Sequence, residues 1–305
     1  MKLGMIIRPQ PEEFDHLKKL GLDFAELDFN PTQYFGMSIE QIREVVPQLK
    51  EASQRTGIEV GAVGRWASHL LNEDGSVNEE EWNNVREIIK AGKELGAKHY
   101  LCSVAYVPQL TYYKNITAAI AALKMIVAEA EQAGMKTCLV NCIMGGNYIT
   151  TPEQWKLVLD EVPGLYLKYD PSHSFVHGGD KGAYLREAFE WGDRFGYVHI
   201  KGVVQLGDSN EPFMWKLRDL CQQHPEMEEV LMHQIMPQVN HYDNPPAGID
   251  SINWRAFFGI LYKHGYDGYL SIEPHSRTWQ GEKGEWGVEY TIRYIRDLMF
   301  NPSEK

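Results

Sequence analysis

The chain has 305 residues, of which 43% are hydrophobic, and a formal net charge of −12 at pH 7. This acidic balance argues against a nucleic-acid partner and against an anionic membrane surface, since both favour a basic face. No apolar run approaches the ~20 residues that span a bilayer. The apolar N-terminus MKLGMII is too short for a signal peptide, and the four cysteines show no disulfide framework. We therefore expect a cytoplasmic protein with no membrane or nucleic-acid partner.

A repeated unit organises the first half of the chain: a helical stretch, one glycine and a short apolar strand. The glycines are Gly21, Gly57, Gly96 and Gly134, spaced 36, 39 and 38 residues apart, and Gly265 repeats the pattern near the C-terminus. A glycine just past a helix adopts the left-handed conformation that ends the helix and turns the chain into the next strand. The spacing is that of a strand-loop-helix unit.

Eight short runs rich in aliphatic, β-branched and aromatic residues are typical of buried parallel strands. In chain order, the predicted strands are Leu3–Ile7, Phe24–Phe29, Glu59–Gly64, Tyr100–Val104, Lys136–Asn141, Tyr166–Tyr169, Tyr197–Lys201 and Tyr269–Ile272. Ser38, Asn78 and Thr151 are predicted N-caps of intervening helices. The pattern predicts one α/β domain over residues 1–305, a single (β/α)8 TIM barrel.

The regular spacing fails between the seventh and eighth strands, which are separated by about 65 residues. Residues 205–248 within this interval are rich in proline. Long loops in compact domains are uncommon and usually functional. We expect an elaborated loop that lies over the barrel mouth or forms a subunit contact in a homo-oligomer.

Three successive strand ends carry groups that bind metals. Strand six is followed by Asp170 and, one turn later, His173; strand seven supplies His199 and Lys201; strand eight ends at Glu273. Each alone has a structural explanation, as a turn cap or a core histidine. Three together at one barrel mouth favour a divalent-metal site, because carboxylates and imidazoles bind such ions and are costly to bury unpaired.

The segments GLYLKYDPSH, YVHIKG and GIDSINWRAFFGILYKHGYDGYLSIEP resemble the C-terminal half of sugar phosphate isomerase/epimerase-like proteins of the xylose isomerase-like TIM-barrel superfamily. In those proteins one divalent metal is held by Glu, Asp, His and Glu from strands five to eight. The resemblance implies that Asp170, His199 and Glu273 hold one Mn, Co, Mg or Zn ion per chain. It also implies that His173 contacts substrate or metal, that Lys201 contacts substrate, and that no nucleotide cofactor is used.

The chain departs from this pattern in strand five, which reads LVNCIM. The family's glutamate falls on Val140 or, after a shift of one residue, on Asn141, and neither is a carboxylate. The aspartate that usually follows the strand-seven lysine is Gly202. Replacement ligands could come from the Asn141 amide or, in the long loop, from His233, His241 or Asp243.

The missing glutamate has a chemical consequence, because two-base epimerisation needs an acid–base group on each face of the sugar. A one-base isomerisation or β-elimination of a keto sugar or keto-glycoside fits better. Glu273 is the expected ligand and base, and His173 or His199 would assist the leaving group.

Aromatic and imidazole groups near the strand ends could contact a sugar ring. Trp66 and His69 follow strand three, and Trp279 and Trp286 follow strand eight. Aromatic rings at a barrel mouth stack on sugars, but ordinary loop packing explains them equally well. We assign Trp66, His69, Asn141 and Lys201 to substrate binding.

Three function hypotheses follow. The first is a divalent-metal-dependent isomerase, epimerase or lyase that abstracts a proton next to the carbonyl of a small-molecule sugar. The second is a metal-free sugar-binding or partner subunit derived from this barrel, which the missing glutamate favours. The third is an apurinic endonuclease, which resembles this barrel but uses three zinc ions, and which the acidic charge disfavours.

Overall fold

The structure is a computed structural model. It describes residues 1–29, 37–65, 68–142, 146–177, 182–205, 220, 224, 242–274, 276 and 278–300. Most of the predicted long loop, including His233 and His241, therefore lies outside the described residues, as does Trp66.

Eight parallel strands close into a barrel, in the order β1-β10-β7-β6-β5-β4-β3-β2. This confirms the predicted (β/α)8 fold, and each predicted strand boundary is within two residues of the observed one. The barrel strands are β1 (Lys2–Ile7), β2 (Phe24–Asp28), β3 (Glu59–Arg65), β4 (His99–Cys102), β5 (Lys136–Val140), β6 (Leu165–Tyr169), β7 (Phe195–Ile200) and β10 (Tyr269–Ile272).

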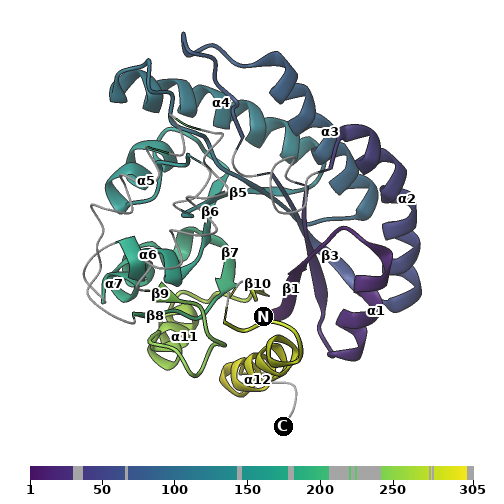
Figure 1. Ribbon diagram of the computed structural model, residues 1–305. Coiled ribbons are helices and arrows are strands. Elements are labelled where there is room, and N and C mark those ends of the chain that lie inside the picture. Colours follow the sequence, from purple (N-terminus) through teal and green to yellow (C-terminus); the bar gives the residue numbers. More distant parts are fainter. Residues whose placement is uncertain are drawn as a thin grey trace.

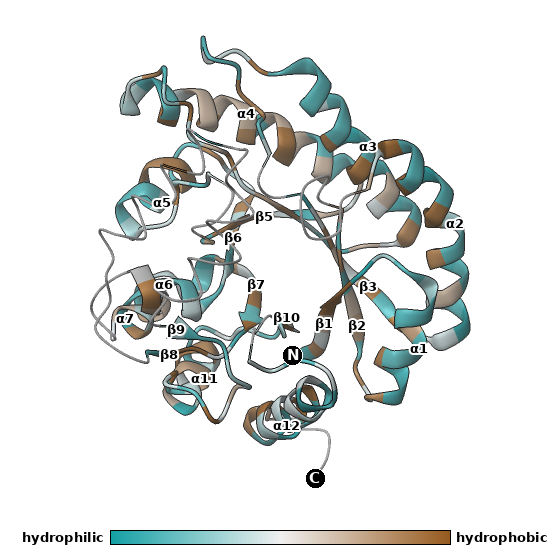
Figure 2. Ribbon diagram, viewed as in Figure 1, coloured by the Kyte–Doolittle hydropathy of each residue, from teal (hydrophilic) through white to brown (hydrophobic). Residues whose placement is uncertain are grey.

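Helices surround the strands as an outer ring (Figure 1). They are α1 (Pro11–Lys19), α2 (Ile39–Thr56), α3 (Glu79–Leu95), α4 (Tyr112–Gln132), α5 (Pro152–Leu159), α6 (Pro171–His177), α7 (Ala183–Trp191), the 3-10 helix η1 (Gly192–Arg194), α11 (Trp254–Lys263) and α12 (Glu282–Leu298). Figure 2 shows hydrophobic strands at the centre and mixed helices whose polar residues lie at the periphery. None of the described helices is long and apolar enough to span a membrane.

The glycine repeat has the conformation that the sequence predicts. Gly57 and Gly96 cap α2 and α3 with φ of 78° and 73°. Ser38 begins α2 with a reciprocal capping box: its hydroxyl accepts the N–H of Gln41, and the Gln41 side chain accepts the N–H of Ser38. These local signals end one element and begin the next, which explains why the positions of the strands could be predicted.

The barrel interior is apolar at one level and polar at the next. The apolar cluster inside the barrel consists of Phe24, Ala62, Leu101, Cys138, Val140 and Tyr197. Toward the carboxyl ends of the strands, the buried residues include Glu26, Lys168, Asp170 and His199. A TIM barrel fills its interior with side chains and places its chemistry at this end. The polar layer is therefore the candidate site.

A small antiparallel ribbon, absent from our sequence prediction, joins the two ends of the long loop. It pairs β8 (Val204–Gln205) with β9 (Tyr242–Asp243). Just before it, Gly202 lies so close to the returning chain that an added Cβ would be 2.0 Å from the Pro245 carbonyl oxygen. The Asn244 side chain also donates to the Gly202 carbonyl at 2.8 Å. Glycine therefore stands at this position because the loop's return segment leaves no room for a side chain.

We predict that Gly202→Ala lowers the free energy of unfolding by about 1–3 kcal/mol, because the methyl group would force the backbones apart. Gly259→Ala is the matched control: nothing lies within 4 Å of its added Cβ in α11, and alanine favours helix, so it should stabilise by about 0.5–1 kcal/mol. Urea unfolding measures both changes. Equal stability of the Gly202 variant and the unmodified protein would contradict this account.

Candidate metal centre

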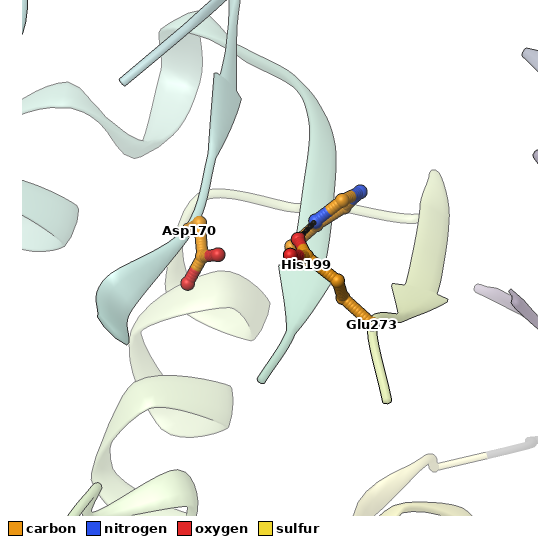
Figure 3. A group of neighbouring side chains, drawn as sticks. All are labelled: Asp170, His199 and Glu273. Carbon is orange, nitrogen blue, oxygen red and sulfur yellow. Dashed lines mark hydrogen bonds and ion pairs between the residues drawn. The ribbon is translucent and has the colours of Figure 1, made fainter. Parts of the chain in front are cut away.

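Three side chains from neighbouring strands converge at the barrel mouth. Asp170 follows β6, His199 lies in β7 and Glu273 follows β10. One potential ligand atom from each lies within 4.8 Å of those of the other two. Figure 3 shows them projecting from their three strands, with a dashed line joining His199 to Glu273. The structure thus brings together the three residues that the sequence assigned to metal binding.

The Asp170 carboxylate has one satisfied and one unsatisfied oxygen. Its Oδ1 accepts the N–H of Ser172 at 2.8 Å, as expected for an aspartate at the start of α6. Its Oδ2 is buried without a hydrogen-bond partner. Burying an anionic oxygen without a partner is costly, so the atom is disposed to bind a cation or a hydrogen-bond donor.

Asn141 fixes the position of Asp170 through two backbone hydrogen bonds. Its Nδ2 donates to the Asp170 carbonyl, and its Oδ1 accepts the Asp170 N–H, both at 2.9 Å. The Asn141 side chain thus acts on the backbone that carries the carboxylate. Its role as a substrate contact or replacement ligand stays a prediction.

His199 is fully buried and has a carboxylate at each ring nitrogen. Nδ1 lies 2.7 Å from Glu273 Oε2, and Nε2 lies 2.8 Å from Glu26 Oε2. Burial alone would lower the pKa of His199, but the negative charge of Glu26 and hydrogen bonds with Glu26 and Glu273 outweigh it and raise that pKa. Burial likewise opposes ionisation of Glu26, yet His199 holds the pKa of Glu26 below its ordinary value.

A buried ammonium group completes the hydrogen bonding of Glu273. Lys201 Nζ donates to Glu273 Oε1 at 2.7 Å. Burial opposes the charge of Lys201, but the carboxylates of Glu273 and Asp170 outweigh burial and raise the pKa of this lysine. Lys201 therefore stays protonated and places a positive charge 2.7 Å from Glu273 Oε1.

His173 lies at the edge of the cluster, on α6. Its Nε2 is 3.5 Å from Asp170 Oδ2, which is within ion-pair distance. Burial opposes protonation of His173, but the nearby Cys142 sulfur and the Asp170 carboxylate outweigh it and raise the pKa. This position next to the ligand cluster is compatible with the predicted role of His173 in proton transfer.

The structure distinguishes between the two alignments of strand five. Val140 packs in the apolar cluster inside the barrel and pairs in register with Lys168 of β6. Asn141, the next residue, bonds to the backbone of Asp170 instead. Val140 therefore faces the barrel interior, and β5, which reads KTCLV, contributes no carboxylate to the site.

The other sequence-predicted contacts lie outside the cluster. His69 is exposed on the loop after β3. Asp243 accepts hydrogen bonds from Asn244 and Ser276, so its carboxylate is engaged in the loop. Trp279 lines a pocket that also includes Glu273, and its ring stacks with that of Trp286, which is 48% exposed.

Sequence reasoning missed Glu26 and gave no role to Lys168. Both are ionisable residues within buried strands, Glu26 in FAELD and Lys168 in LYLKY. Each is buried, and the positive charge of Lys168 contributes to lowering the pKa of Glu26. The sequence did contain a signal for them, namely a charged residue inside a predicted buried strand. Such a residue needs a partner inside the barrel.

The family model of the xylose isomerase-like TIM barrel matches residues 14–298. The chain therefore belongs to the xylose isomerase-like TIM-barrel family. No curated protein matches the sequence significantly.

Solved structures with similar folds are sugar epimerases and related proteins. D-allulose 3-epimerase from Methylomonas sp. has a TM-score of 0.68 at 15% identity, with 98% of each chain covered. The 3-keto-D-glucoside 4-epimerase YcjR from E. coli has a TM-score of 0.64 at 15% identity, covering 97% of this chain and 99% of that one. The IOLI protein, solved with a bound zinc atom, has a TM-score of 0.67 at 15% identity, with 98% of each chain covered. These likenesses extend over the whole barrel.

We predict that Asn141→Ala lowers the free energy of unfolding, because it strips both backbone groups of Asp170 of their partners. Each buried unsatisfied group costs about 1–3 kcal/mol. The control is Asn83→Ala on the exposed face of α3, which should change stability by less than about 0.5 kcal/mol. Chemical denaturation compares the two, and equal midpoints would contradict the positioning role of Asn141.

Proposed function

We propose that the protein is a divalent-metal-dependent sugar isomerase/epimerase-like enzyme. It acts on a keto sugar or keto-glycoside by removing a proton next to a carbonyl. The observation that carries this proposal is the convergence of Asp170, His199 and Glu273 at the barrel mouth, with the buried Asp170 Oδ2 lacking a hydrogen-bond partner.

The donor set suits a divalent ion. Two carboxylates and one imidazole are borderline-hard ligands of the kind that bind Mn²⁺, Co²⁺, Mg²⁺ or Zn²⁺. Asp170, His199 and Glu273 would hold the ion, one per chain, leaving other positions for substrate oxygens. When bound, such an ion polarises a carbonyl and makes the neighbouring C–H bond more acidic. The zinc atom in the related IOLI structure supports this interpretation.

The residues themselves supply proton transfer and orientation. Glu273 is the proposed base, and the Lys201 ammonium at its Oε1 holds the carboxylate in position. Lys201 also offers a hydrogen-bond donor to a substrate oxygen that gains negative charge. His173, with its raised pKa, is the proposed acid for the departing or newly formed hydroxyl.

The missing carboxylate on β5 favours one-base chemistry. Val140 offers no proton-transfer group at the inward position of β5. Among the described carboxylates of the cluster, Asp170 is a proposed ligand and Glu26 contacts His199, so Glu273 is the one that we assign as a base. Isomerisation or β-elimination needs one such base, whereas direct epimerisation requires groups on both faces. The relatives act on D-allulose and on a 3-keto-D-glucoside, which supports a keto sugar or keto-glycoside as substrate.

One observation favours the second candidate, a metal-free sugar-binding or partner subunit. Lys201 already places a positive charge 2.7 Å from Glu273, and His199 bonds to carboxylates through both nitrogens. Two cationic groups therefore neutralise much of the cluster. The feature that speaks against this alternative is the buried Asp170 Oδ2, which accepts no hydrogen bond and lies 3.5 Å from His173 Nε2.

The metal assignment predicts about one equivalent of Mn, Co, Mg or Zn per chain in protein purified without chelator. Asp170→Ala should lose the ion, because it removes one of the three proposed ligands, the one whose buried Oδ2 accepts no hydrogen bond. Elemental analysis of both proteins measures this. Absence of metal from the unmodified protein, together with no uptake on titration, would overturn the enzyme proposal and leave the sugar-binding alternative.

The reaction assignment predicts that the protein exchanges the hydrogen next to the carbonyl of its substrate with solvent. Panels of ketohexoses and 3-keto-glucosides are incubated in D₂O and deuterium incorporation is followed by NMR. Glu273→Gln should slow exchange by roughly 10²–10⁴-fold, the usual contribution of a general base. The control is Glu187→Gln, a partly buried carboxyl on α7 that bonds to the Tyr169 hydroxyl and should leave exchange unchanged. Full exchange by the Glu273 variant would contradict the assignment.

A further inference from the structure

A buried carboxylate on β2 contacts the metal-site imidazole from across the barrel. Glu26 is fully buried, and its Oε1 and Oε2 lie 3.0 Å and 2.8 Å from His199 Nε2. The other ring nitrogen, Nδ1, lies 2.7 Å from Glu273 Oε2. The His199 ring is thus held between β2 on one side and the end of β10 on the other.

This arrangement determines which nitrogen is available to a metal ion. An imidazole binds a metal through a nitrogen lone pair, while its other nitrogen carries a proton and donates a hydrogen bond. A carboxylate accepts hydrogen bonds and cannot donate them when ionised. In this structure each ring nitrogen has a carboxylate partner, Glu26 at Nε2 and Glu273 at Nδ1. Only Nδ1 faces a proposed ligand, so an ion held by Asp170 and Glu273 would replace the proton on Nδ1, while Nε2 would keep its proton and donate it to Glu26.

We propose that Glu26 is a positioning residue of the metal centre: by accepting the Nε2–H of His199, it fixes the ring so that Nδ1 faces a divalent ion held with Asp170 and Glu273. This inference rests on the proposed metal-dependent function. It assigns a role to β2, a strand that contributes no ligand itself. Removing the carboxylate should weaken metal binding even though all three ligands remain.

A purely structural role makes a different prediction. If Glu26 only neutralises buried charge, its replacement would lower the stability of the metal-free protein and leave metal affinity in the folded protein unchanged. Metal affinity, measured on folded protein, therefore separates positioning from packing. Thermal unfolding in the presence of chelator gives the stability change on its own.

The experiment compares the unmodified protein with Glu26→Gln and Glu187→Gln. Free Mn²⁺ is followed by its electron paramagnetic resonance signal during titration, and circular dichroism verifies folding. We expect the Glu26 variant to bind Mn²⁺ roughly 10–100-fold more weakly, the usual effect of losing such a carboxylate partner. The Glu187 control should retain the affinity of the unmodified protein, because its carboxyl bonds to the Tyr169 hydroxyl rather than to His199.

The outcomes separate this inference from the proposed function. If the unmodified protein binds Mn²⁺ and folded Glu26→Gln binds it equally well, the positioning role is wrong and the proposed function stands. If the unmodified protein takes up no metal, both are wrong. Should Glu26→Gln fail to fold, Glu26→Asp keeps the charge but shortens the reach to Nε2, and affinity equal to that of the unmodified protein would overturn the inference.

Discussion

The structure depends on the hydrogen bonds and ion pairs between the ionisable side chains that are buried at the barrel mouth. His199 is central, because its two nitrogens contact Glu26 and Glu273, and these residues come from opposite directions around the ring. Burying a charge is unfavourable unless it is paired and hydrogen-bonded. The contact of His199 with both carboxylates gives three buried polar side chains their partners.

The need to pair buried charges also explains why the cluster is suited to bind a cation. Glu26 contacts His199, and Glu273 contacts both His199 and Lys201, so these carboxylates have positively charged or donating partners. Asp170 differs, since its Oδ2 is buried without a hydrogen bond and is 3.5 Å from the imidazole of His173. Asp170 Oδ2 is therefore the carboxylate oxygen of the cluster that lacks a hydrogen-bond donor. A divalent ion would bind this oxygen. The neighbouring Glu273 would then remove the proton next to the carbonyl of a substrate.

Local sequence signals predicted the fold because glycines and caps mark the element ends. Gly57 and Gly96 adopt positive φ where the repeat predicts it, and the eight strands follow. The sequence also grouped Asp170, His199 and Glu273, whose ligand atoms the structure places within 4.8 Å, although their metal binding stays a prediction.

Long-range pairing was beyond sequence reasoning. Glu26 and His199 are 173 residues apart, and only barrel closure brings them together. A second buried strand histidine, His99 at the start of β4, has a different environment from His199. His99 bonds to the Gly61 carbonyl, and burial lowers its pKa to about 4, so it is a neutral core histidine. Gly202 could be recognised as a departure from the family, but its cause, the Pro245 carbonyl, required the path of the returning chain.

The most direct test of this account is a crystal structure of the protein soaked in Mn²⁺, with anomalous data collected near the manganese edge. We predict one anomalous peak per chain, within coordination distance of Asp170 Oδ2, His199 Nδ1 and a Glu273 oxygen. It would show that the polar mouth of the barrel is a metal centre built from β6, β7 and β10. Absence of a peak there, with Lys201 still bonded to Glu273 at saturating Mn²⁺, would contradict the account. The cluster would then be a metal-free site whose carboxylates are neutralised by Lys201 and His199.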